Sequence, residues 1–384
     1  MLLTELTPDQ TAIRDLARHF ARREVAPKAA ALDAASQFDD TLVAKLAALG
    51  FLGMLIPEQH DGLALDSLSY LLALEEIAVA DASAAVLMSV HNSLPTQMLL
   101  RFGSDAQRET WLRPMARGEL LGAFCLSEPE AGSDAASLRT QARRDGDHWV
   151  LDGTKAWVTN GNTAGVLMVM ARTDTPEARR GGRGISAFIV TPDLPGFSVS
   201  KKENKLGLRA SPTVQVVLDG CRVPADRMLG DEGMGFVYAI RSLEHGRLGI
   251  AAQAVGIARA AFEACLDYAK ERRQFGQPIS DFQAIQFKLA DMAARITAAR
   301  QLLHATALAK DRGLDVEAEA SMAKLTASET AMWVTTQAVQ LFGGYGYVKE
   351  YPVERYFRDA KITEIYEGTS EIQRIVIARA VLGQ

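Results

Sequence analysis

Cysteine is scarce in this sequence, and basic residues are not in excess. The 384 residues include three cysteines, Cys125, Cys221 and Cys265, and carry a formal net charge of −5. An odd and scattered set of cysteines argues against a disulfide framework and favours reduced thiols, as in a cytoplasm. A protein that binds nucleic acid usually has a basic surface, and the net negative charge of this chain gives no sign of one. We therefore expect a cytoplasmic protein without a nucleic-acid partner.

Long apolar runs are also missing. GVLMVMA at 165–171 is among the longest, and it is far shorter than the roughly 18 residues that a membrane span needs. The start, MLLTELTPDQ, has neither the basic and apolar segments of a signal peptide nor an arginine-rich transit pattern. Thr7 and Gln10 instead predict a capping box that opens a helix. We expect no membrane span.

Several short catalytic motifs are absent as well. The six histidines form no HExxH, the cysteines form no CxxC, and no GxSxG is present. The glycines of GGYGY at 343–347 lack GxGxxG spacing and follow a helical pattern, whereas a dinucleotide fingerprint follows a strand. The sequence therefore predicts no metal site, no hydrolase elbow and no Rossmann-type nucleotide site.

Three regions differ in their residue pattern. Residues 1–120 have helical periodicity, whereas 121–229 contain short apolar runs such as HWVLD, AWVTN and TVQVVLD beside the turn dipeptides Asp145-Gly146, Asp152-Gly153 and Asp219-Gly220. No helical pattern lies between these runs, so we expect an antiparallel, barrel-like β domain. The boundaries at 120 and 229 follow from these changes in pattern.

Helical periodicity returns in residues 230–384. Ile285, Leu289, Met292, Ile296 and Leu303 recur at helical spacing within alanine-rich segments. Long helices are expected at about 234–274, 281–312 and 317–342, packed as a four-helix bundle. The predicted fold class is therefore α+β and multidomain: an N-terminal helical domain, a middle β domain and a C-terminal helical bundle.

The stretch TEIYEGTSEIQ at 363–373 contains three glutamates. Two have ordinary roles. A helix is predicted to open after Pro352 and to run to Ile365, and on it Glu364 can pair with Lys361. Glu371 suits the first turn of the next helix, where a negative charge is favourable. Glu367 has neither role. From this stretch alone, a functional carboxylate and a solvated loop side chain remain equally open.

The next helix is predicted to begin at a capping box in SEIQ, Ser370 to Gln373.

Two other segments each allow a functional and an ordinary structural interpretation. GAFCLSEPEAGSDAASL at 122–138 offers hydroxyl and backbone donors to an anion or a heteroaromatic edge, but is also ordinary turn chemistry. Arg272 and Arg273 end a helix before Gly276, either as capping cations or as phosphate contacts.

Five motifs in order resolve these alternatives. SEPEAGSD, KAWVTNG, ERRQFGQPISDFQ, QLFGGYGY and IYEGTSEIQ span nearly the whole chain, and together they resemble the acyl-CoA dehydrogenase family, most closely its short-chain (butyryl-CoA) and related bacterial branch. The resemblance implies the helix–β–helix architecture, FAD as cofactor and dehydrogenation of a saturated acyl-CoA to the trans-2-enoyl-CoA. It also implies electron transfer to an electron-transfer flavoprotein and a homotetramer built as a dimer of dimers. β-Oxidation and branched-chain amino acid catabolism are the pathways expected.

The resemblance also assigns roles to residues of this sequence. Glu367 corresponds to the catalytic base that removes the α-proton while hydride passes to N5 of FAD. Acyl-CoA contacts fall on Ser133, Glu244, Arg247 and Gly368. Cofactor contacts fall on Phe124, Leu126, Ser127, Gly132, Ser133, Trp157, Val158, Thr159, Arg272, Phe275, Phe282, Gln283, Gln340, Leu341, Gly343, Gly344, Thr369 and Glu371. Ser127 and Glu130 depart from the residues most frequent in the family, threonine and glycine.

The sequence leaves three alternative functions open. A flavin oxidase or monooxygenase would share the fold, a DNA-binding relative would need a basic stripe, and a helical scaffold would bind no flavin. Acyl length and branching depend on a pocket that we place around 87–90 and Leu243. A minority branch of the family carries its glutamate on a bundle helix, at a place that falls on Gly246 here. That glycine supports Glu367 as the base.

Overall fold

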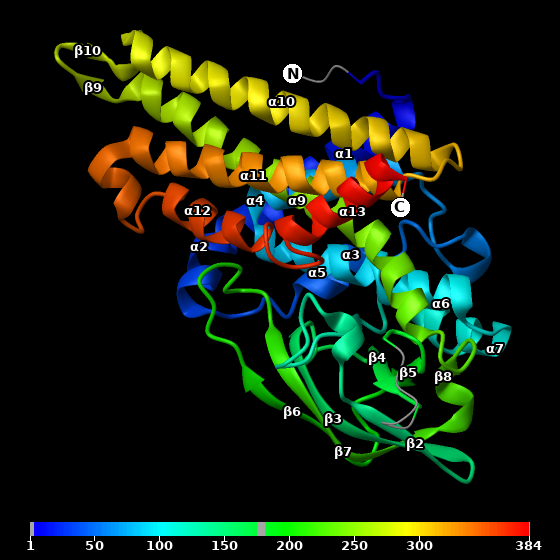
Figure 1. Cartoon of the computed structure of the whole chain (residues 1–384). Helices are drawn as coiled ribbons and strands as arrows, with labels where there is room; N and C mark the ends of the chain where they lie inside the picture. Colours follow the sequence, from blue (N-terminus) through cyan, green and yellow to red (C-terminus); the bar gives the residue numbers. More distant parts are fainter. Residues whose placement is uncertain (1–3, 175–180, 384) are drawn as a thin grey trace.

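The structure, a computed structural model, describes residues 4–174 and 181–383. A helical N-terminal part, a β part and a helical C-terminal part follow one another along the chain (Figure 1). The predicted fold class is therefore confirmed. In Figure 1 the β part lies below the long C-terminal helices, and the N-terminal helices fill the space between them.

The N-terminal part consists of short helices whose ends match the sequence signals. Thr7 and Gln10 form the predicted capping box at the start of the first helix. Two short π-helical segments, Ala21–Val25 and Arg108–Leu112, interrupt the α-helices. The α-helices are α1 (Pro8–Phe20), α2 (Ala26–Ala35), α3 (Leu42–Ala48), α4 (Ser67–Ala80), α5 (Ala82–Ser93), α6 (Pro95–Phe102), α7 (Asp105–Gln107) and α8 (Arg113–Ala116).

The β part is one eight-stranded sheet with the order β6-β7-β3-β2-β4-β5-β8 and with β1 paired to β4. The expectation of a purely antiparallel sheet is wrong at β1, which runs parallel to β4, and at one bridge between β2 and β4. A parallel neighbour is possible here because a long excursion through β2 and β3 separates β1 from β4. The strands are β1 (Gly122–Cys125), β2 (Gln141–Asp145), β3 (His148–Thr159), β4 (Val166–Arg172), β5 (Ile185–Val190), β6 (Phe197–Lys202), β7 (Thr213–Pro224) and β8 (Met228–Leu229).

Only one of the three Asp-Gly pairs reverses the chain. Asp145-Gly146 forms the turn between β2 and β3, but Asp152-Gly153 lies inside β3 and Asp219-Gly220 lies inside β7. The pairing of these strands shifts register between Leu151 and Gly153, so the glycines mark a bulge and not a turn. Two predicted strands, HWVLD and AWVTN, are consequently one long strand.

The C-terminal part has three long helices and two short ones. The predicted long helices are present with ends that differ by up to three residues, and the helix that follows Pro352 stops at Ile362, before the predicted Ile365. A small hairpin of β9 (Arg273–Gln274) and β10 (Gln277–Pro278) separates the first two. The helices are α9 (Gly235–Glu271), α10 (Gln283–Asp311), α11 (Glu317–Phe342), α12 (Val353–Ile362) and α13 (Ser370–Leu382).

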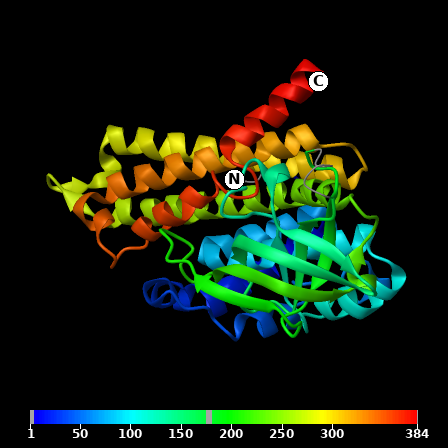
Figure 2. The same ribbon diagram turned by 60° about the horizontal axis from the view of Figure 1, so that its bottom comes forward.

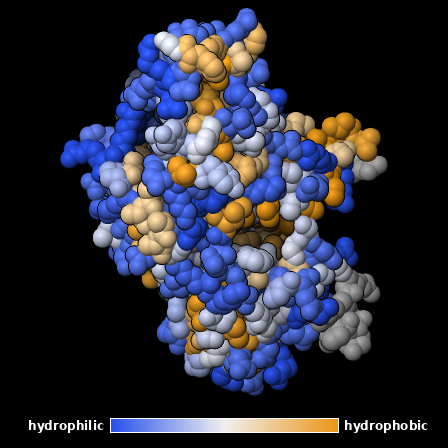
Figure 3. Space-filling view, turned by 90° about the vertical axis from the view of Figure 1, so that its left-hand side faces the viewer, coloured by the Kyte–Doolittle hydropathy of each residue, from blue (hydrophilic) through white to orange (hydrophobic). Residues whose placement is uncertain are grey.

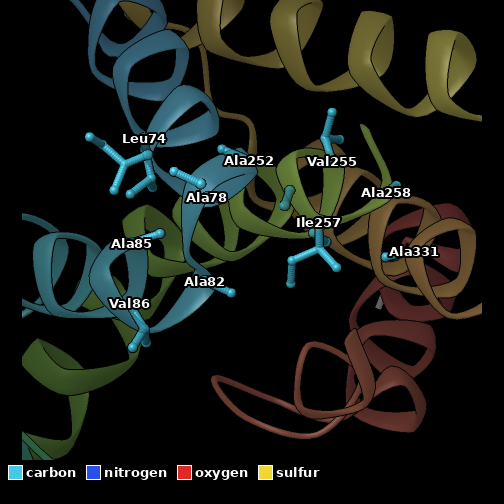
Figure 4. Packing of buried hydrophobic residues seen from close by; sticks show 14 of the residues in the cluster. Leu74, Ala78, Ala82, Ala85, Val86, Ala252, Val255, Ile257, Ala258 and Ala331 are labelled. Atoms are coloured by element: carbon cyan, nitrogen blue, oxygen red, sulfur yellow. The ribbon is translucent and has the colours of Figure 1, made fainter. Parts of the chain in front are cut away.

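Small residues bring the central helices close together. In Figure 4, Ala78 of α4 and Ala82 and Ala85 of α5 lie on one side of α9, and Ala331 of α11 lies on another. A Cβ atom on Gly256 would lie 2.6 Å from the Cβ of Ala78, so α4 and α9 approach more closely than any larger residue allows. Among the described residues, only α9 is long and apolar enough to cross a membrane, and 78% of its most apolar window is buried within the protein. Packing therefore accounts for its composition.

Candidate active site

Glu367 lies in the turn that joins α12 to α13. Its φ of 51° is in the left-handed region, and Gly368 follows with a φ of 94°. A non-glycine residue in this region costs about 1–2 kcal/mol and persists only where its surroundings hold it. The next residue, Thr369, is the N-cap of α13, because its hydroxyl accepts a hydrogen bond from the backbone N–H of Ile372. The predicted capping box at Ser370 is therefore wrong by one residue.

Side chains from three helices hold this turn in place. Lys324 of α11 donates a hydrogen bond of 2.5 Å from Nζ to the carbonyl oxygen of Gly368. Gln373 of α13 donates to the same oxygen at 2.9 Å. On the other side, the hydroxyl of Tyr366 donates to the side-chain oxygen of Gln253 on α9. The unusual backbone at Glu367 is thus fixed by contacts that are distant in sequence.

The carboxylate of Glu367 points into the protein. Both oxygen atoms are buried and have no hydrogen-bond partner among the residues that the structure describes, although the residue as a whole is partly exposed. Burial raises the pKa of this carboxyl group to about 7, while the positive charges of Lys324 and Arg247 oppose the rise. A carboxyl group with this pKa exchanges protons near neutral pH, as a general base must.

Gly246 of α9 faces this carboxylate. A Cβ atom built on Gly246 would lie 1.9 Å from Oε2 of Glu367 and 3.3 Å from Cδ2 of Leu94. Any side chain at this position would collide with Glu367 in its present conformation. The two positions therefore point at one small volume, in agreement with the vacancy that the sequence suggested.

The wall next to the carboxylate combines apolar and hydroxyl groups. Leu94 lies 3.3 Å from a Cβ built on Gly246, while Leu87 and Val90 of α5 are buried elsewhere in the helical core and Leu243 is partly buried. The hydroxyls of Tyr70 and Ser89 are buried and unpartnered among the described residues, and both approach Gly249, one turn along α9 from Gly246. Burial holds the pKa of Tyr70 well above its ordinary value, so its hydroxyl stays protonated.

The residues expected to contact acyl-CoA lie on several elements. Arg247 is buried on α9, donates to the hydroxyl of Ser321 at 3.2 Å and lies 3.8 Å from the carboxylate of Glu317. Glu244, one turn earlier, is partly buried, and burial followed by the charge of Glu317 raises its pKa. Ser133 is exposed on the segment after β1. The structure groups Arg247 with Glu367, whereas no hydrogen bond or ion pair among the described residues connects Ser133 to either.

An aromatic surface forms where β1 and β3 end. Trp157 has a φ of 60° and is 62% exposed, while the next residue, Val158, is buried. Beneath this surface the buried side chains of Lys155 and Glu128 form an ion pair of 2.7 Å. The backbone N–H of Ala156 donates to the carbonyl of Ser127, which ties the two segments together. Phe124, Leu126, Gly132 and Thr159 belong to the same two segments.

A second group of expected cofactor contacts lies at the outer end of the bundle. Arg272 and the glycines of the turn after α11 line a cleft of about 480 Å³. The guanidinium of Arg272 lies 5.2 Å from the ring centroid of Tyr345. Phe275 is 95% exposed and meets Phe282 edge-on. Arg272 and Arg273 lie after the end of α9 at Glu271, and not in its last turn as predicted. Gln283, Gln340, Leu341, Gly343 and Gly344 complete this group, and no described atom lies within 4 Å of a Cβ built on either glycine.

These two groups are separate within one chain. The hairpin of β9 and β10 projects from the end of the bundle away from the β part (Figures 1 and 2). The face in Figure 3 shows apolar side chains around a hollow in the middle of the molecule. An aromatic surface, a hydroxyl-rich segment, a guanidinium and an open glycine turn are groups that suit a flavin ring and a pyrophosphate. The residues therefore fit FAD, in two separated parts.

Lys324, Gln253, Tyr366 and Gln373 were missed by sequence reasoning. The signal for Lys324 was available, because it lies at helical spacing among alanines that are all buried: Ala320, Ala327 and Ala331. A lysine within an apolar stripe needs a buried partner. The partner, a backbone carbonyl 44 residues later, could not be read from the sequence.

Known proteins match this chain along its whole length. Three family models cover it: the acyl-CoA dehydrogenase N-terminal domain at residues 7–119, the middle domain at 123–221 and the C-terminal domain at 233–382. The mitochondrial short-chain specific acyl-CoA dehydrogenase of Mus musculus is 49% identical over 378 residues, which cover 98% of this chain and 91% of that protein.

Solved structures agree with these matches. Butyryl-CoA dehydrogenase from Megasphaera elsdenii superposes with a TM-score of 0.96 at 44% identity, covering 99% of both chains. A structure described for the electron transferring flavoprotein of Acidaminococcus fermentans and flavin-based electron bifurcation contains a chain with a TM-score of 0.97 at 46% identity, again covering 99% of both chains.

Proposed function

Because the chain belongs to the acyl-CoA dehydrogenase family, we propose that it removes the α-proton and the β-hydride of a saturated short-chain acyl-CoA, with Glu367 as the base. The product is the trans-2-enoyl-CoA. The observation that carries the assignment of the base is the buried carboxylate of Glu367, which no described group hydrogen-bonds and whose pKa lies at about 7.

The turn around Glu367 supplies more than the carboxylate. Removal of the α-proton places negative charge on the thioester oxygen, and a backbone N–H aimed at that oxygen stabilises it. Loss of one such donor typically costs about 3–4 kcal/mol. The backbone N–H of Glu367 is the donor that we assign, and Gly368, without a side chain, allows the thioester to approach. Arg247, Glu244 and Ser133 are assigned to the remainder of the acyl-CoA.

FAD supplies the hydride acceptor when it is bound. We assign the isoalloxazine surface to Trp157, Val158 and Thr159 with the segment from Phe124 to Ser133, and to Thr369 and Glu371 at the start of α13. We assign the pyrophosphate and adenosine contacts to Arg272 and to the residues of the bundle end. Because these two groups are separated in one chain (Figure 1), the second is supplied by a neighbouring subunit of a homotetramer.

Electrons leave to an electron-transfer flavoprotein, in line with the chain found in the Acidaminococcus fermentans structure. A short acyl group is supported by the Mus musculus and Megasphaera elsdenii relatives. Within the pathways expected from the sequence, a short saturated acyl-CoA is an intermediate of fatty-acid β-oxidation. Branched short acyl groups, from branched-chain amino acid catabolism, are the alternative substrates.

The test is anaerobic mixing of the purified protein with acyl-CoAs from C4 to C12 and with isobutyryl-, 2-methylbutyryl- and isovaleryl-CoA. We expect the flavin absorbance to bleach fastest with a short chain. Glu367→Gln should retain acyl-CoA binding but slow bleaching by about 10²–10⁴-fold, the range for loss of a positioned base. Glu329→Gln is the matched control, because Glu329 is exposed on α11 and pairs with Arg374 of α13. No bleaching with any acyl-CoA, or a normal rate in Glu367→Gln, contradicts the proposal.

A further inference from the structure

Lys324 is a buried lysine that has no role in the proposed reaction. Its side chain is fully buried on α11, between the buried alanines Ala320 and Ala327. Lysine is almost never fully buried unless its ammonium group is paired. Its nitrogen donates to the carbonyl oxygen of Gly368, 2.5 Å away. A hydrogen bond to a neutral carbonyl leaves the positive charge of the ammonium group uncompensated.

The negative charge that faces this ammonium is Glu367. Burial lowers the pKa of Lys324 to about 8, and Glu367 is the strongest of the carboxylates that oppose this, ahead of Glu364 and Glu371. Arg247 is the other cation beside Glu367, and it also interacts with Glu317 and Glu244. The remaining ionisable groups facing Glu367 are Tyr70 on α4 and Tyr366, whose pKa values burial raises, so both stay neutral.

We propose that Lys324 is a positioning residue for the base: its ammonium group holds the Gly368 carbonyl, and so the turn, while its charge favours the ionised form of Glu367. The inference rests on the assignment of Glu367 as the base. It does not follow from that assignment, because the base could equally be held by backbone contacts alone.

The acceptor of the Lys324 hydrogen bond is the Gly368 carbonyl and not the Glu367 carboxylate, which suits a role of Glu367 as a base. If the ammonium group donated to the carboxylate, that hydrogen bond would occupy one of the lone pairs that can accept the α-proton and would lower the basicity of the carboxylate. Since it donates to the next carbonyl instead, both carboxylate oxygens stay free of hydrogen bonds from described residues. The charge stabilises the carboxylate through space, and Gln373 shares the task of holding the carbonyl.

The expected sign follows from the charge. A nearby cation lowers the pKa of a carboxyl group, so its removal raises the pKa of Glu367 further above 7. The rate of flavin bleaching depends on ionised Glu367 and therefore rises with pH through this pKa. Without Lys324 the rise moves to higher pH, by about 1–3 pH units if the interaction is typical of a charge within ~4–6 Å. The rate consequently falls most at low pH.

The experiment compares Lys324→Met and Lys324→Gln with wild type. Both variants remove the charge, and two substitutions guard against one that fails to fold. Lys324→Arg retains the charge and should return the pH profile towards wild type. The matched control is Lys361→Met, which removes an exposed cation of α12 that pairs with Glu364 in the turn after this helix and should leave the profile in place. The bleaching rate with butyryl-CoA is measured between pH 5.5 and 9.5.

A second readout follows the carboxyl group directly. The infrared C=O band of protonated Glu367, identified by its loss in Glu367→Gln, should disappear at higher pH in the two neutral variants than in wild type. The role of Lys324 is overturned if, in both neutral variants, the infrared band disappears at the same pH as in wild type and the bleaching rate has the same pH dependence. This result is distinguishable from failure of the proposed base, which would appear as normal bleaching in Glu367→Gln.

Discussion

At the scale of single residues, the site depends on one glycine as much as on one glutamate. Gly246 leaves the space that the Glu367 carboxylate fills, since a Cβ there would lie 1.9 Å from Oε2. Glu244 cannot replace either residue, because two positions along a helix are roughly 200° apart around its axis. The reacting point can therefore be reached from two directions, the turn before α13 and one face of α9.

This convergence predicts a rescue. Glu367→Gly should lose nearly all bleaching activity, and Gly246→Glu in that background should restore part of it, because the new carboxylate enters the vacated space from α9. Bleaching with butyryl-CoA is the measurement, and Gly246→Gln in the same background is the control. Restoration by glutamine as well would contradict the explanation. Restoration should be partial, since an error of about 1 Å in placement can cost about 10²-fold.

At the scale of elements, a buried carboxyl group helps to join α12 to the β part. Asp359 accepts a hydrogen bond of 2.6 Å from the backbone N–H of Leu208, which lies in the loop between β6 and β7. Arg358 beside it pairs with Asp33 of α2 at 2.6 Å. All three parts of the chain therefore meet at the helix that precedes the turn containing Glu367.

Asp359 should make stability depend on pH. Burial raises its pKa from 3.8 to about 7, and the charges of Asp81 and Asp33 add to the rise. Because the folded state binds the Asp359 proton more tightly than the unfolded state does, this group's contribution to stability is fully present below pH 3.8. The contribution is lost as the pH rises to about 7 and Asp359 ionises in the folded protein. Each pKa unit of difference corresponds to about 1.4 kcal/mol in the free energy of unfolding.

Asp359→Asn keeps an acceptor for Leu208 but removes the ionisation. We expect the difference in unfolding temperature, variant minus wild type, to be more positive at pH 8 than at pH 5, as measured by calorimetry. Asp267→Asn, at an exposed position of α9, is the control and should show little dependence of this difference on pH. An equal difference at both values for Asp359→Asn would show that its ionisation does not affect folding.

At the scale of the whole molecule, the proposed cofactor contacts of one chain form two separate groups. The aromatic surface around Trp157 and the cleft around Arg272 lie in different places (Figures 1 and 2). Large apolar side chains remain exposed on the hairpin and on α13, which projects from the body in Figure 2. Phe275 is 95% exposed, and Val381 and Leu382 are 72% and 67% exposed. Subunit contacts that cover these side chains would also complete each cofactor site.

We therefore expect a particle of four times the 41.6 kDa chain mass by light scattering. Arg272→Ala should lower FAD retention during gel filtration while leaving the helical content by circular dichroism unchanged. Arg273→Ala is the matched control, because Arg273 is exposed and donates to the carbonyl of Gly276 in its own hairpin. An active monomer loaded with FAD, or equal FAD retention in both variants, would contradict this assembly.

The sequence by itself determined the order of the three parts, the long helices and the motif that contains Glu367. These features depend on local periodicity and on short motifs, which the residues carry with them. It could not decide that Asp152-Gly153 lies in a strand, since a bulge depends on the partner strand. Nor could it identify the partner of Lys324, a backbone carbonyl distant in sequence, or the pKa of Glu367, which burial by other elements sets. Tertiary structure decided these features because each depends on atoms that only folding brings together.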